Sequence, residues 1–433
     1  MQGILYKYRL FPFIIMTLGL AILATGGIYL INSFSTQKEV MASSSHEAMA
    51  TRATSVVNPQ VCPPANLVRP ATALSTHTGN QLGTTKQPAL HQNLVYAYNT
   101  DRAGMLIRYD TATGTSTMVA NLAHTHIQEA QLSTDGKTIL FLSQLANHPA
   151  IQMIRIDGKN LQTLYCAYNN ATFTNLLWSP DQQLAVFAAK SATDSKIAPT
   201  IQLLNLHKGT IKTLVKADSH IAYRLRAWNG NALVYMSGYD ATGATPPHDV
   251  FMLDVLHDNI MRAATISGSA WSMNLTPDGK TLILSQCAGD LSTDTYQAPA
   301  IISTQPASGG KLTLIYASHV YAVTQVRAIS NKSLLFIISD PTGNNKQIGL
   351  WRINVDGTGL KHLTNQAKRL NGQQSAWSSI SRDQQLYAAV NYEDIGKQRR
   401  FKIFYGSLNG GPSSLALVTN AGEDAQIVGW TAL

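Results

Sequence analysis

Short apolar segments and polar turns alternate in a repeating pattern along most of the chain, from about residue 131 to the C-terminus. Each copy begins with a turn introduced by Trp, Leu or Ile, continues with an apolar strand and a loop, and ends with two further strands around a second turn. Successive first turns are 46–54 residues apart. They lie at residues 132–136, 178–182, 228–230, 275–279, 329–332, 380–383 and 430–431. The pattern predicts many short strands of regular spacing.

A period of this length, with four short strands in each copy, is typical of a β-propeller blade. One blade cannot bury both of its faces alone, so we expect the copies to form a single all-β domain over residues 93–433. The first blade begins with strands at residues 94–98 and 105–109. Full blades are predicted at residues 126–165, 173–216, 222–266, 270–316, 323–364 and 374–419.

The first blade lacks an inner strand, and the end of the chain supplies one. Residues 426–430 have the pattern of the inner strand at 175–178, and too few residues follow them to complete another blade. We therefore expect this segment to close the ring by pairing with residues 94–98. Closure would give a seven-bladed propeller without free sheet edges. Six or eight blades stay open as alternatives, because the turns at 229–230, 331–332 and 382–383 depart from the motif.

Three of the first turns share a short motif. They read Ser-Thr-Asp-Gly-Lys at 133–137, Ser-Pro-Asp-Gln at 179–182 and Thr-Pro-Asp-Gly-Lys at 276–280. These turns resemble the repeats of TolB-like (WD40-like) β-propellers, and residues 350–364 are similar to the outer-strand signature of that family. Residues 151–164 are a looser copy. The resemblance covers about residues 130–433 and implies a propeller fold. It implies no single function, because such propellers serve as scaffolds, sensors and enzyme appendages.

The N-terminal region predicts a membrane anchor. Residues 10–31 contain no charge and follow Lys7 and Arg9. About 20 apolar residues in a helix span a bilayer, and flanking positive charge stays on the cytoplasmic side. We therefore expect a cytoplasmic segment at 1–9, a single transmembrane helix at 10–32 and an extracytoplasmic propeller. The alternative is a signal peptide that is cleaved from a secreted protein.

Residues 33–92 are rich in Ser, Thr, Ala, Pro, Asn and Gln, a composition that favours a flexible linker. Of the three cysteines, Cys62 lies in this linker, whereas Cys166 and Cys287 lie in different predicted blades. A disulfide requires Cα atoms within about 7 Å, and the predicted ring holds Cys166 and Cys287 much farther apart than that. We therefore expect no structural disulfide.

Charge and motifs exclude several function classes. The net charge of +9 is spread out, with +2 in residues 1–40, +2 in 41–93 and +5 in the remainder, and it forms no stripe suited to nucleic acid. The chain has no Gly-x-Ser-x-Gly, His-Glu-x-x-His, Gly-x-x-x-x-Gly-Lys or Gly-x-Gly-x-x-Gly motif. We therefore expect no cofactor and favour a non-catalytic role.

The pair His124 and His126 is the candidate metal site. Alternate residues of a strand project to one face, so two imidazoles would meet one ion near the channel mouth. Two ligands do not complete a site, and exposed loop histidines are the simpler interpretation. Some TolB-like lyases use channel histidines with a metal. The resemblance therefore keeps open an enzyme alternative, a metal-dependent polysaccharide lyase or hydrolase.

The longest predicted loops all lie on one face of the ring, because strand direction alternates within a blade. They span residues 190–200, 238–250, 287–300, 340–347 and 391–400. Loops on a rigid scaffold often carry binding residues. Eight basic residues on this face or near the inner strands are the candidate binding residues. They are Lys368, Arg369, Lys397, Arg399, Arg400, Arg224, Arg226 and Arg327. Four acidic residues, Glu393, Asp394, Glu423 and Asp424, are expected to offset part of this charge.

Together these observations predict a membrane-anchored propeller that binds a protein or a cell-surface polymer through its loop-rich face. A channel enzyme is one alternative, and a subunit of a transmembrane sensor is another. About nine cytoplasmic residues leave little room for a signalling element, so a sensor would require a partner helix in the membrane.

Overall fold

The structure is a computed structural model. It describes residues 61–72, 74, 91–145, 147–168, 171–191, 199–216, 221–230, 232–240, 249–265, 269–288, 297–339, 347–370 and 379–433. The predicted anchor at 10–32 lies outside these residues. Within the described ranges, no helix has the length and apolar character needed to cross a membrane.

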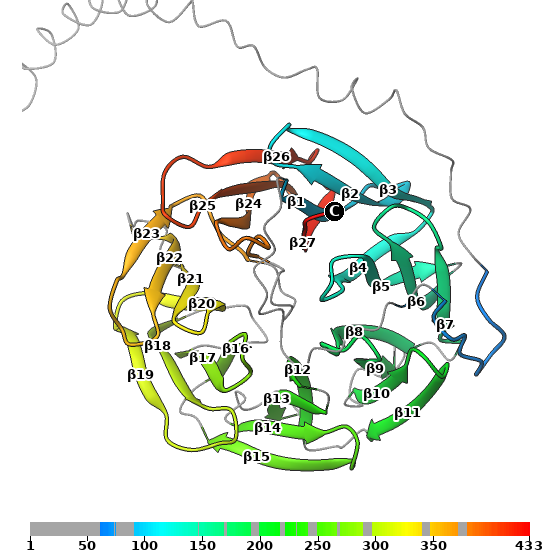
Figure 1. Cartoon of the computed structure of the whole chain (residues 1–433), viewed down its shortest axis with the longest axis horizontal. Coiled ribbons are helices and arrows are strands. Elements are labelled where there is room, and N and C mark those ends of the chain that lie inside the picture. The colour runs from blue at the N-terminus through cyan, green and yellow to red at the C-terminus, as the bar shows by residue number, and fades with distance from the viewer. Residues whose placement is uncertain are drawn as a thin grey trace, which may run out of the picture. The chain divides into compact units, whose positions relative to one another are not determined.

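Seven β-sheets stand around a central axis and form a seven-bladed propeller (Figure 1). The seven-bladed β-propeller expected from the repeats is confirmed. The first three blades contain β27 (Asp424–Thr431), β1 (Asn93–Asn99), β2 (Ala103–Asp110) and β3 (Thr115–Ala123); β4 (His126–Leu132), β5 (Thr138–Leu145), β6 (His148–Arg155) and β7 (Gln162–Cys166); and β8 (Ala171–Trp178), β9 (Leu184–Ser191), β10 (Thr200–Asn205) and β11 (Thr210–Val215).

The remaining blades follow in chain order around the ring. They contain β12 (Ile221–Asn229), β13 (Leu233–Asp240), β14 (Asp249–Asp254) and β15 (Asn259–Thr265); β16 (Ser269–Leu275), β17 (Thr281–Ala288), β18 (Gln297–Pro306) and β19 (Thr313–Ser318); β20 (Ala322–Ser330), β21 (Ser333–Ser339), β22 (Gly349–Asn354) and β23 (Lys361–Thr364); and β24 (Leu386–Ile395), β25 (Gln398–Ser407) and β26 (Ser414–Val418). The predicted inner strand of blade seven falls mainly in residues 371–378, outside the described residues.

Burial follows position within the blade. The second strands β1 and β5 are buried at nearly every residue, because both of their faces pack against neighbouring blades. The outer strand β11 is mainly exposed. This difference explains why the second strands read as continuous apolar runs, whereas outer strands are more polar.

The two ends of the chain share blade one, as predicted. Strand β27 pairs with β1 in antiparallel register from Asn93 opposite Thr431 to Asn99 opposite Asp424. The Trp430 side chain is fully buried in a cluster with Leu94 and residues of blade seven. The ring therefore closes non-covalently, through strand pairing and apolar packing.

Every described inner strand carries a β-bulge where it pairs with the second strand of its blade. The register shifts occur in β27, β4, β8, β12, β16 and β20. A bulge releases backbone groups from the ladder, and these groups need other partners when they are buried.

Side chains of the preceding blade satisfy several of these backbone groups. The Gln131 amide donates to the Leu176 carbonyl at 2.6 Å and accepts the Trp178 N–H at 2.9 Å. The Asn274 amide oxygen accepts the Ala328 N–H at 2.9 Å. Blades two and three, and blades five and six, are joined in this way.

The repeated first turn has a defined chemistry. The Ser133 hydroxyl donates to the Asp135 carboxylate at 2.6 Å and accepts the Thr138 N–H at 2.9 Å. Each turn of this kind thus closes on its own side chains. The same hydroxyl-to-carboxylate bond recurs in the pairs Ser179–Asp181, Thr276–Asp278 and Ser381–Asp383.

The turns that depart from the motif bind their neighbours. Asn229 donates to the Gly279 carbonyl at 2.9 Å, and Asn331 accepts the Asp278 N–H at 3.1 Å. Arg382 is 2% exposed, and its guanidinium donates to the carbonyls of Trp430 in blade one and of Ser133 and Thr134 in blade two. Burial lowers the pKa of Arg382 to about 9 because desolvation penalises its charge. The residues that depart from the turn motif therefore make contacts to neighbouring turns. They do not change the number of blades, which is seven.

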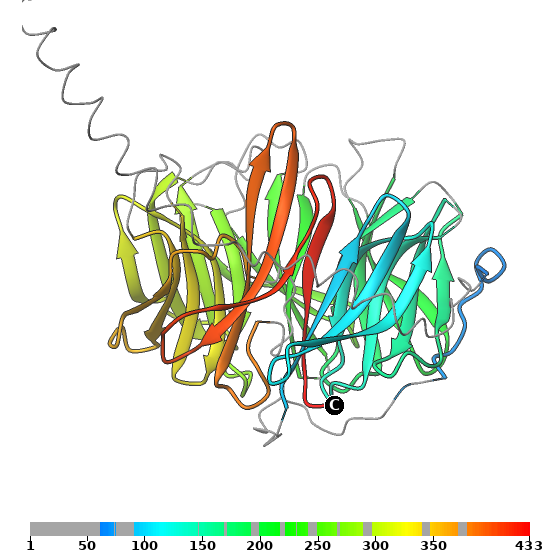
Figure 2. The ribbon, with the colours of Figure 1, turned by 90° about the horizontal axis from the view of Figure 1, so that it is seen from above.

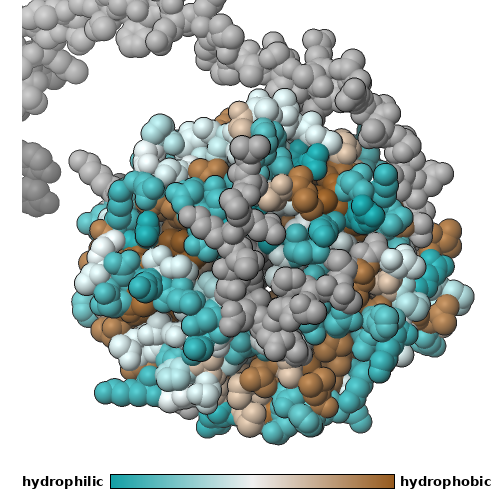
Figure 3. Space-filling view, in the orientation of Figure 1, coloured by the Kyte–Doolittle hydropathy of each residue, from teal (hydrophilic) through white to brown (hydrophobic). Residues whose placement is uncertain are grey.

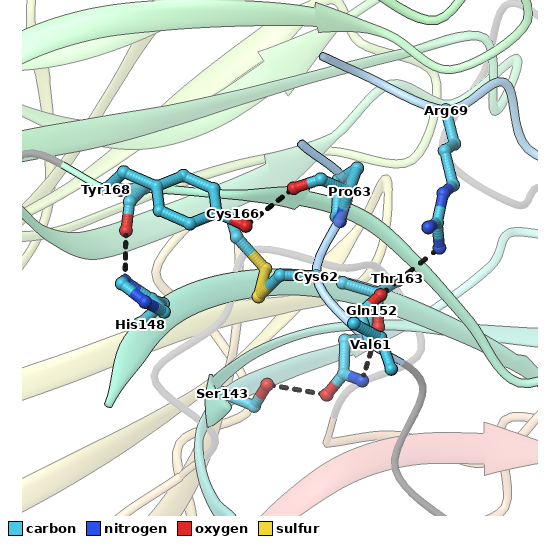
Figure 4. Close-up of a disulfide and its surroundings, with 11 residues drawn as sticks. Val61, Cys62, Pro63, Arg69, Ser143, His148, Gln152, Thr163, Cys166 and Tyr168 are labelled. Atoms are coloured by element: carbon cyan, nitrogen blue, oxygen red, sulfur yellow. Dashed lines mark hydrogen bonds between the residues drawn. A yellow bond between two sulfur atoms is a disulfide. The ribbon is translucent and has the colours of Figure 1, made fainter. Parts of the chain in front are cut away.

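One prediction is wrong: Cys62 and Cys166 form a disulfide, with Cα atoms 5.7 Å apart (Figure 4). Residues 61–72, expected to belong to a flexible linker, lie instead along the outer edge of blades two and three. The Arg69 N–H donates to the Leu164 carbonyl of β7, and the Ala71 N–H donates to the Leu206 carbonyl beside β10. Because Cys62 and Cys166 are 104 residues apart in the sequence, no local pattern indicated that they are close in space.

Deletion of residues 425–433 should destabilise the entire domain by more than about 5 kcal/mol, since burial of side chains such as Ile427, Val428 and Trp430 contributes roughly 2 kcal/mol each. Thermal unfolding followed by circular dichroism measures the change. A deletion variant that melts like the full chain would contradict closure by β27.

Replacement of Arg382 by Met should lower the free energy of unfolding by about 2–4 kcal/mol, because three backbone carbonyls lose a charged donor. Denaturant titration measures this loss. The control Arg102→Met removes an arginine whose side chain is 88% exposed, and it should change stability by less than about 0.5 kcal/mol. Equal effects of the two substitutions would argue against the bridging role of Arg382.

Candidate functional site

Residues of five blades line a cavity of about 240 Å³. Because only the central channel is accessible to so many blades, the cavity lies on the ring axis. Its polar lining consists of Gln128, Glu129, Asn175, Arg224, Arg226, Arg369 and Gln426. Several of these residues stand near the beginning of an inner strand, the end at which one blade connects to the next. We call this space the channel cavity.

Three of the eight predicted basic residues meet at the channel cavity. Arg224 and Arg226 come from β12, and Arg369 precedes blade seven, where its backbone pairs with Val390. Arg224 and Arg369 are exposed, whereas Arg226 is 9% exposed and donates from Nε to the Ser237 hydroxyl at 2.9 Å. The β-bulge between Leu225 and Ala227 contains Arg226.

One carboxylate, Glu129, belongs to the described lining. Its two oxygens accept the N–H groups of Asn175 and Leu176, each at 2.8 Å. The β8 bulge turns both N–H groups toward blade two, so this position requires two acceptors. Gln131, two residues further along β4, faces one N–H and one carbonyl, which a neutral amide satisfies. Glu129 thus serves the junction between the blades, and the three arginines dominate the charge of the cavity.

The other basic residues of blade seven form a separate group on a hairpin. Strands β24 and β25 extend beyond the rest of the ring (Figure 2). Their antiparallel register sets Glu393 opposite Arg400 and Asp394 opposite Arg399, and both pairs form ion pairs, at 3.2 and 2.9 Å. Lys402 also pairs with Glu393, at 2.9 Å, and lowers the pKa of that carboxyl. The predicted offset of the basic charge by nearby acids is present here.

Arg399 and one further cation, Lys368, lie against the ring of Tyr392 on this hairpin. Lys368 lies 4.7 Å from the ring centroid, and Arg399 lies 4.4 Å from it. Lys368 also donates to the Tyr392 carbonyl at 2.6 Å. Cation–π contacts of this kind fix side chains that would otherwise be mobile. Lys397, in contrast, lies exposed at the hairpin tip.

Arg327 lies between blades and not in the channel cavity. It is 4% exposed and donates to the Ser272 hydroxyl at 3.2 Å and to the Val326 carbonyl at 2.7 Å. Burial lowers its pKa to about 10. The sequence position near an inner strand suggested a binding residue, and the structure assigns Arg327 a role in packing between blades five and six.

Two of the predicted offsetting acids lie outside the hairpin. The Glu423 carboxylate accepts a bond from the Tyr98 hydroxyl, and desolvation with this contact raises the pKa of Tyr98. It also accepts the Asn420 N–H at 2.7 Å. Glu423 thus has partners of its own at the start of β27. Asp424 is partly exposed at the beginning of that strand.

The two predicted metal ligands are exposed on the connection between blades one and two. His124 follows β3 with a positive φ of 55°, so it is not part of the strand that contains His126. The alternation expected of a continuous strand is therefore interrupted. Across the described ranges, no three His, Cys, Asp or Glu side chains are grouped as metal ligands.

Four of the five long loops expected on this face fall largely in ranges that the structure does not describe. The fifth, residues 391–400, is the β24–β25 hairpin.

The sequence did not indicate Gln128, Glu129 or Gln426 as lining residues. Gln128 occupies the bulge of β4, Glu129 follows it, and Gln426 lies two residues before the bulge of β27, so their signal was polar side chains close to the bulges of inner strands. On the face seen in Figures 1 and 3, small hydrophilic and hydrophobic patches alternate around the coloured part of the rim.

Comparison with known proteins agrees with this architecture. No protein-family model matches the sequence, and no curated protein matches it. Among solved structures, an oligogalacturonate lyase in complex with manganese matches with a TM-score of 0.52 at 12% identity, over 70% of this chain and 84% of that chain. An uncharacterized protein from Listeria monocytogenes matches with a TM-score of 0.50 at 10% identity, over 84% of this chain and 97% of that one.

TolB from Acinetobacter baumannii is a further match, with a TM-score of 0.43 at 17% identity over 62% of this chain. The resemblance to TolB-like β-propellers expected from the repeats has a structural counterpart, and that match concerns the fold alone. The chain spans 61% of the length of the Acinetobacter TolB. Similarity at these identities describes the fold alone and assigns no activity. The chemistry of the site therefore rests on the residues of this chain.

Glu129 and Gln131 should not be interchangeable at the junction of blades two and three, because they face different backbone groups. Glu129→Gln places an amide N–H₂ against a backbone N–H, and Gln131→Glu removes the donor to the Leu176 carbonyl. Each substitution should lower the free energy of unfolding by about 1–3 kcal/mol. Gln128→Glu, on the same strand, is the control. Denaturant titration that finds all three variants as stable as the wild type would contradict this assignment.

Proposed function

We propose that the protein is a membrane-anchored, extracytoplasmic binding module that takes a carboxylate-bearing group of a protein or cell-surface polymer into the channel cavity. The observation that carries the proposal is the convergence of Arg224, Arg226 and Arg369 on one cavity. The described lining contains a single carboxylate, Glu129, which accepts two backbone N–H groups. Guanidinium groups bind carboxylates through paired hydrogen bonds.

The size of the cavity limits what enters it. A volume of about 240 Å³ is below the range of roughly 300–1,000 Å³ that is typical for drug-sized ligands. It suits one sugar unit or one side chain of a larger partner. The remainder of that partner would then lie over the face with the β24–β25 hairpin, where exposed Lys397 adds positive charge.

The lining favours binding over acid–base chemistry. Arginine remains protonated at neutral pH and exchanges no proton there, so the three guanidinium groups hold an anion without transferring protons. The Glu129 carboxylate already accepts two backbone N–H groups, and its protonation would weaken the junction between blades two and three. These properties support the non-catalytic role.

The disulfide supports an extracytoplasmic location. Bonds such as Cys62–Cys166 persist in oxidising compartments and are rare in the cytosol. The third cysteine, Cys287, is buried, and desolvation raises its pKa to about 12, so it is protected from reaction. The arrangement agrees with the orientation expected from Lys7 and Arg9 before the apolar segment.

Binding should depend on the two exposed arginines of the cavity. The detergent-solubilised full chain is titrated calorimetrically with hexaglutamate and with oligogalacturonate of about six units, and neutral hexaglutamine serves as the reference. We expect the combined substitution Arg224→Gln and Arg369→Gln to weaken binding of at least one anionic probe by more than about tenfold, because two charged contacts are lost. Higher salt should weaken wild-type binding.

Arg155→Gln is the matched control, since this arginine is half-exposed and pairs with Asp157 at 2.8 Å, away from the channel. It should bind the probes like the wild type. If the wild type binds neither anionic probe, or if the double variant binds them unchanged, the channel cavity is not an anion site. Shortening of oligogalacturonate during the titration would instead indicate the enzyme alternative.

A further inference from the structure

The segment at residues 61–72, which we call the N-terminal strap, lies at the outside of the ring beside β7 (Figure 1), and its backbone bonds reach blades two and three. Its first contact is covalent, because Cys62 is bonded to Cys166 at the end of β7. Near the other end of the strap, the Ala71 N–H donates to the Leu206 carbonyl at 2.8 Å. The strap therefore connects two blades that are consecutive around the ring.

Hydrogen bonds along the strap are few. The Arg69 N–H donates to the Leu164 carbonyl at 2.9 Å. The Gln162 side chain donates to the Pro70 carbonyl at 2.7 Å and accepts the Thr72 N–H at 3.0 Å. At the disulfide end, the Tyr168 hydroxyl donates to the Pro63 carbonyl at 2.7 Å. Most of these bonds are partly exposed to solvent, where each contributes little.

Apolar contact along the strap is also limited. Val68 is 8% exposed and joins the core cluster of blades two and three, whereas Val61 and Leu67 are 80% and 50% exposed. Cys62 packs against a small cluster that contains Leu145 and Cys166. Two buried residues, Pro63 and Val68, with partial packing of Ala71 and a few hydrogen bonds, barely offset the conformational entropy of ordering twelve residues. The covalent bond is therefore the main constraint on the strap.

Ring closure does not involve the strap. Blade one is closed by the pairing of β27 with β1 and by Arg382, on the side of the ring where blades seven, one and two meet. The strap contacts reported above are all with blades two and three. Loss of the strap should therefore leave the ring intact.

We propose that the Cys62–Cys166 disulfide is a redox-sensitive latch, which holds the N-terminal strap on blades two and three and releases it on reduction while the propeller stays closed. The reductant is a dithiol. Its thiolate attacks the partly exposed Cys62 sulfur, the buried Cys166 leaves as a thiolate and takes up a proton, and the second thiol of the reductant displaces Cys62. The reductant ends as a disulfide, and both protein cysteines end as thiols.

The latch would set the length of free chain before the propeller. This consequence rests on the membrane anchor of the proposed function. With the bond open, the described residues 62–72 would be added to the chain between the predicted anchor and the propeller.

The test uses the detergent-solubilised full chain, purified without reductant and compared with the same protein after mild treatment with dithiothreitol. Alkylation after denaturation should count one free thiol before reduction and three after it. Hydrogen exchange should show that the amides of Arg69, Ala71 and Thr72 lose protection by more than tenfold on reduction. The amides of β1 and β27 should keep their protection.

Cys62→Ser and Cys166→Ser should each show the reduced exchange pattern without reductant, and Cys287→Ser is the matched control that should behave like the wild type. Three free thiols in the unreduced protein would overturn the proposal. So would a strap whose protection survives reduction, or a β27 that loses protection together with the strap. None of these readouts depends on the anion site or the anchor, so failure of the latch is distinguishable from failure of the proposed function.

Discussion

A propeller must satisfy the backbone groups that its own inner strands release. In this chain every described inner strand bulges where it meets the second strand, and at several junctions backbone groups near the bulge bond to side chains of the preceding blade. An unpaired buried backbone group costs about as much as a lost hydrogen bond, so each junction requires a matching side chain. The rest of the structure depends on this matching, because it links one blade to the next where the ring is narrowest.

The same constraint explains the composition of the channel cavity. Glu129 is a carboxylate because two N–H groups face it, and Gln131 is an amide because one N–H and one carbonyl face it. These acceptors are therefore committed to the junction. Arg224 and Arg369, by contrast, are exposed, so they are available to a ligand. The cavity is basic because its carboxylate, Glu129, is bound to backbone N–H groups, whereas the guanidinium groups of Arg224 and Arg369 are exposed.

Much of the fold followed from the sequence, since a blade is a local unit. Its strands are short, its turns use adjacent residues such as Ser133 and Asp135, and its period is visible without a structure. Closure was also predictable, because the pattern of residues 426–430 matched an inner strand that lacked a blade. The site was less accessible to prediction. Arg224, Arg226 and Arg369 were named as basic residues, yet only the ring places them at one cavity, whereas Arg327, with a similar sequence context, is buried between blades.

The disulfide shows where local reasoning fails. Cys62 lies in a segment whose composition predicts a flexible chain, and neither apolar periodicity nor turn residues indicate where that segment goes. Its path is set by a partner 104 residues later in the chain. A strap that buries only Pro63 and Val68 gives little hydrophobic signal, because a covalent bond replaces much of the apolar surface that would otherwise be needed to order it. Segments fixed in this way are therefore the ones that composition assigns wrongly, and a cysteine that precedes a predicted domain is the feature that should prompt a search for its partner.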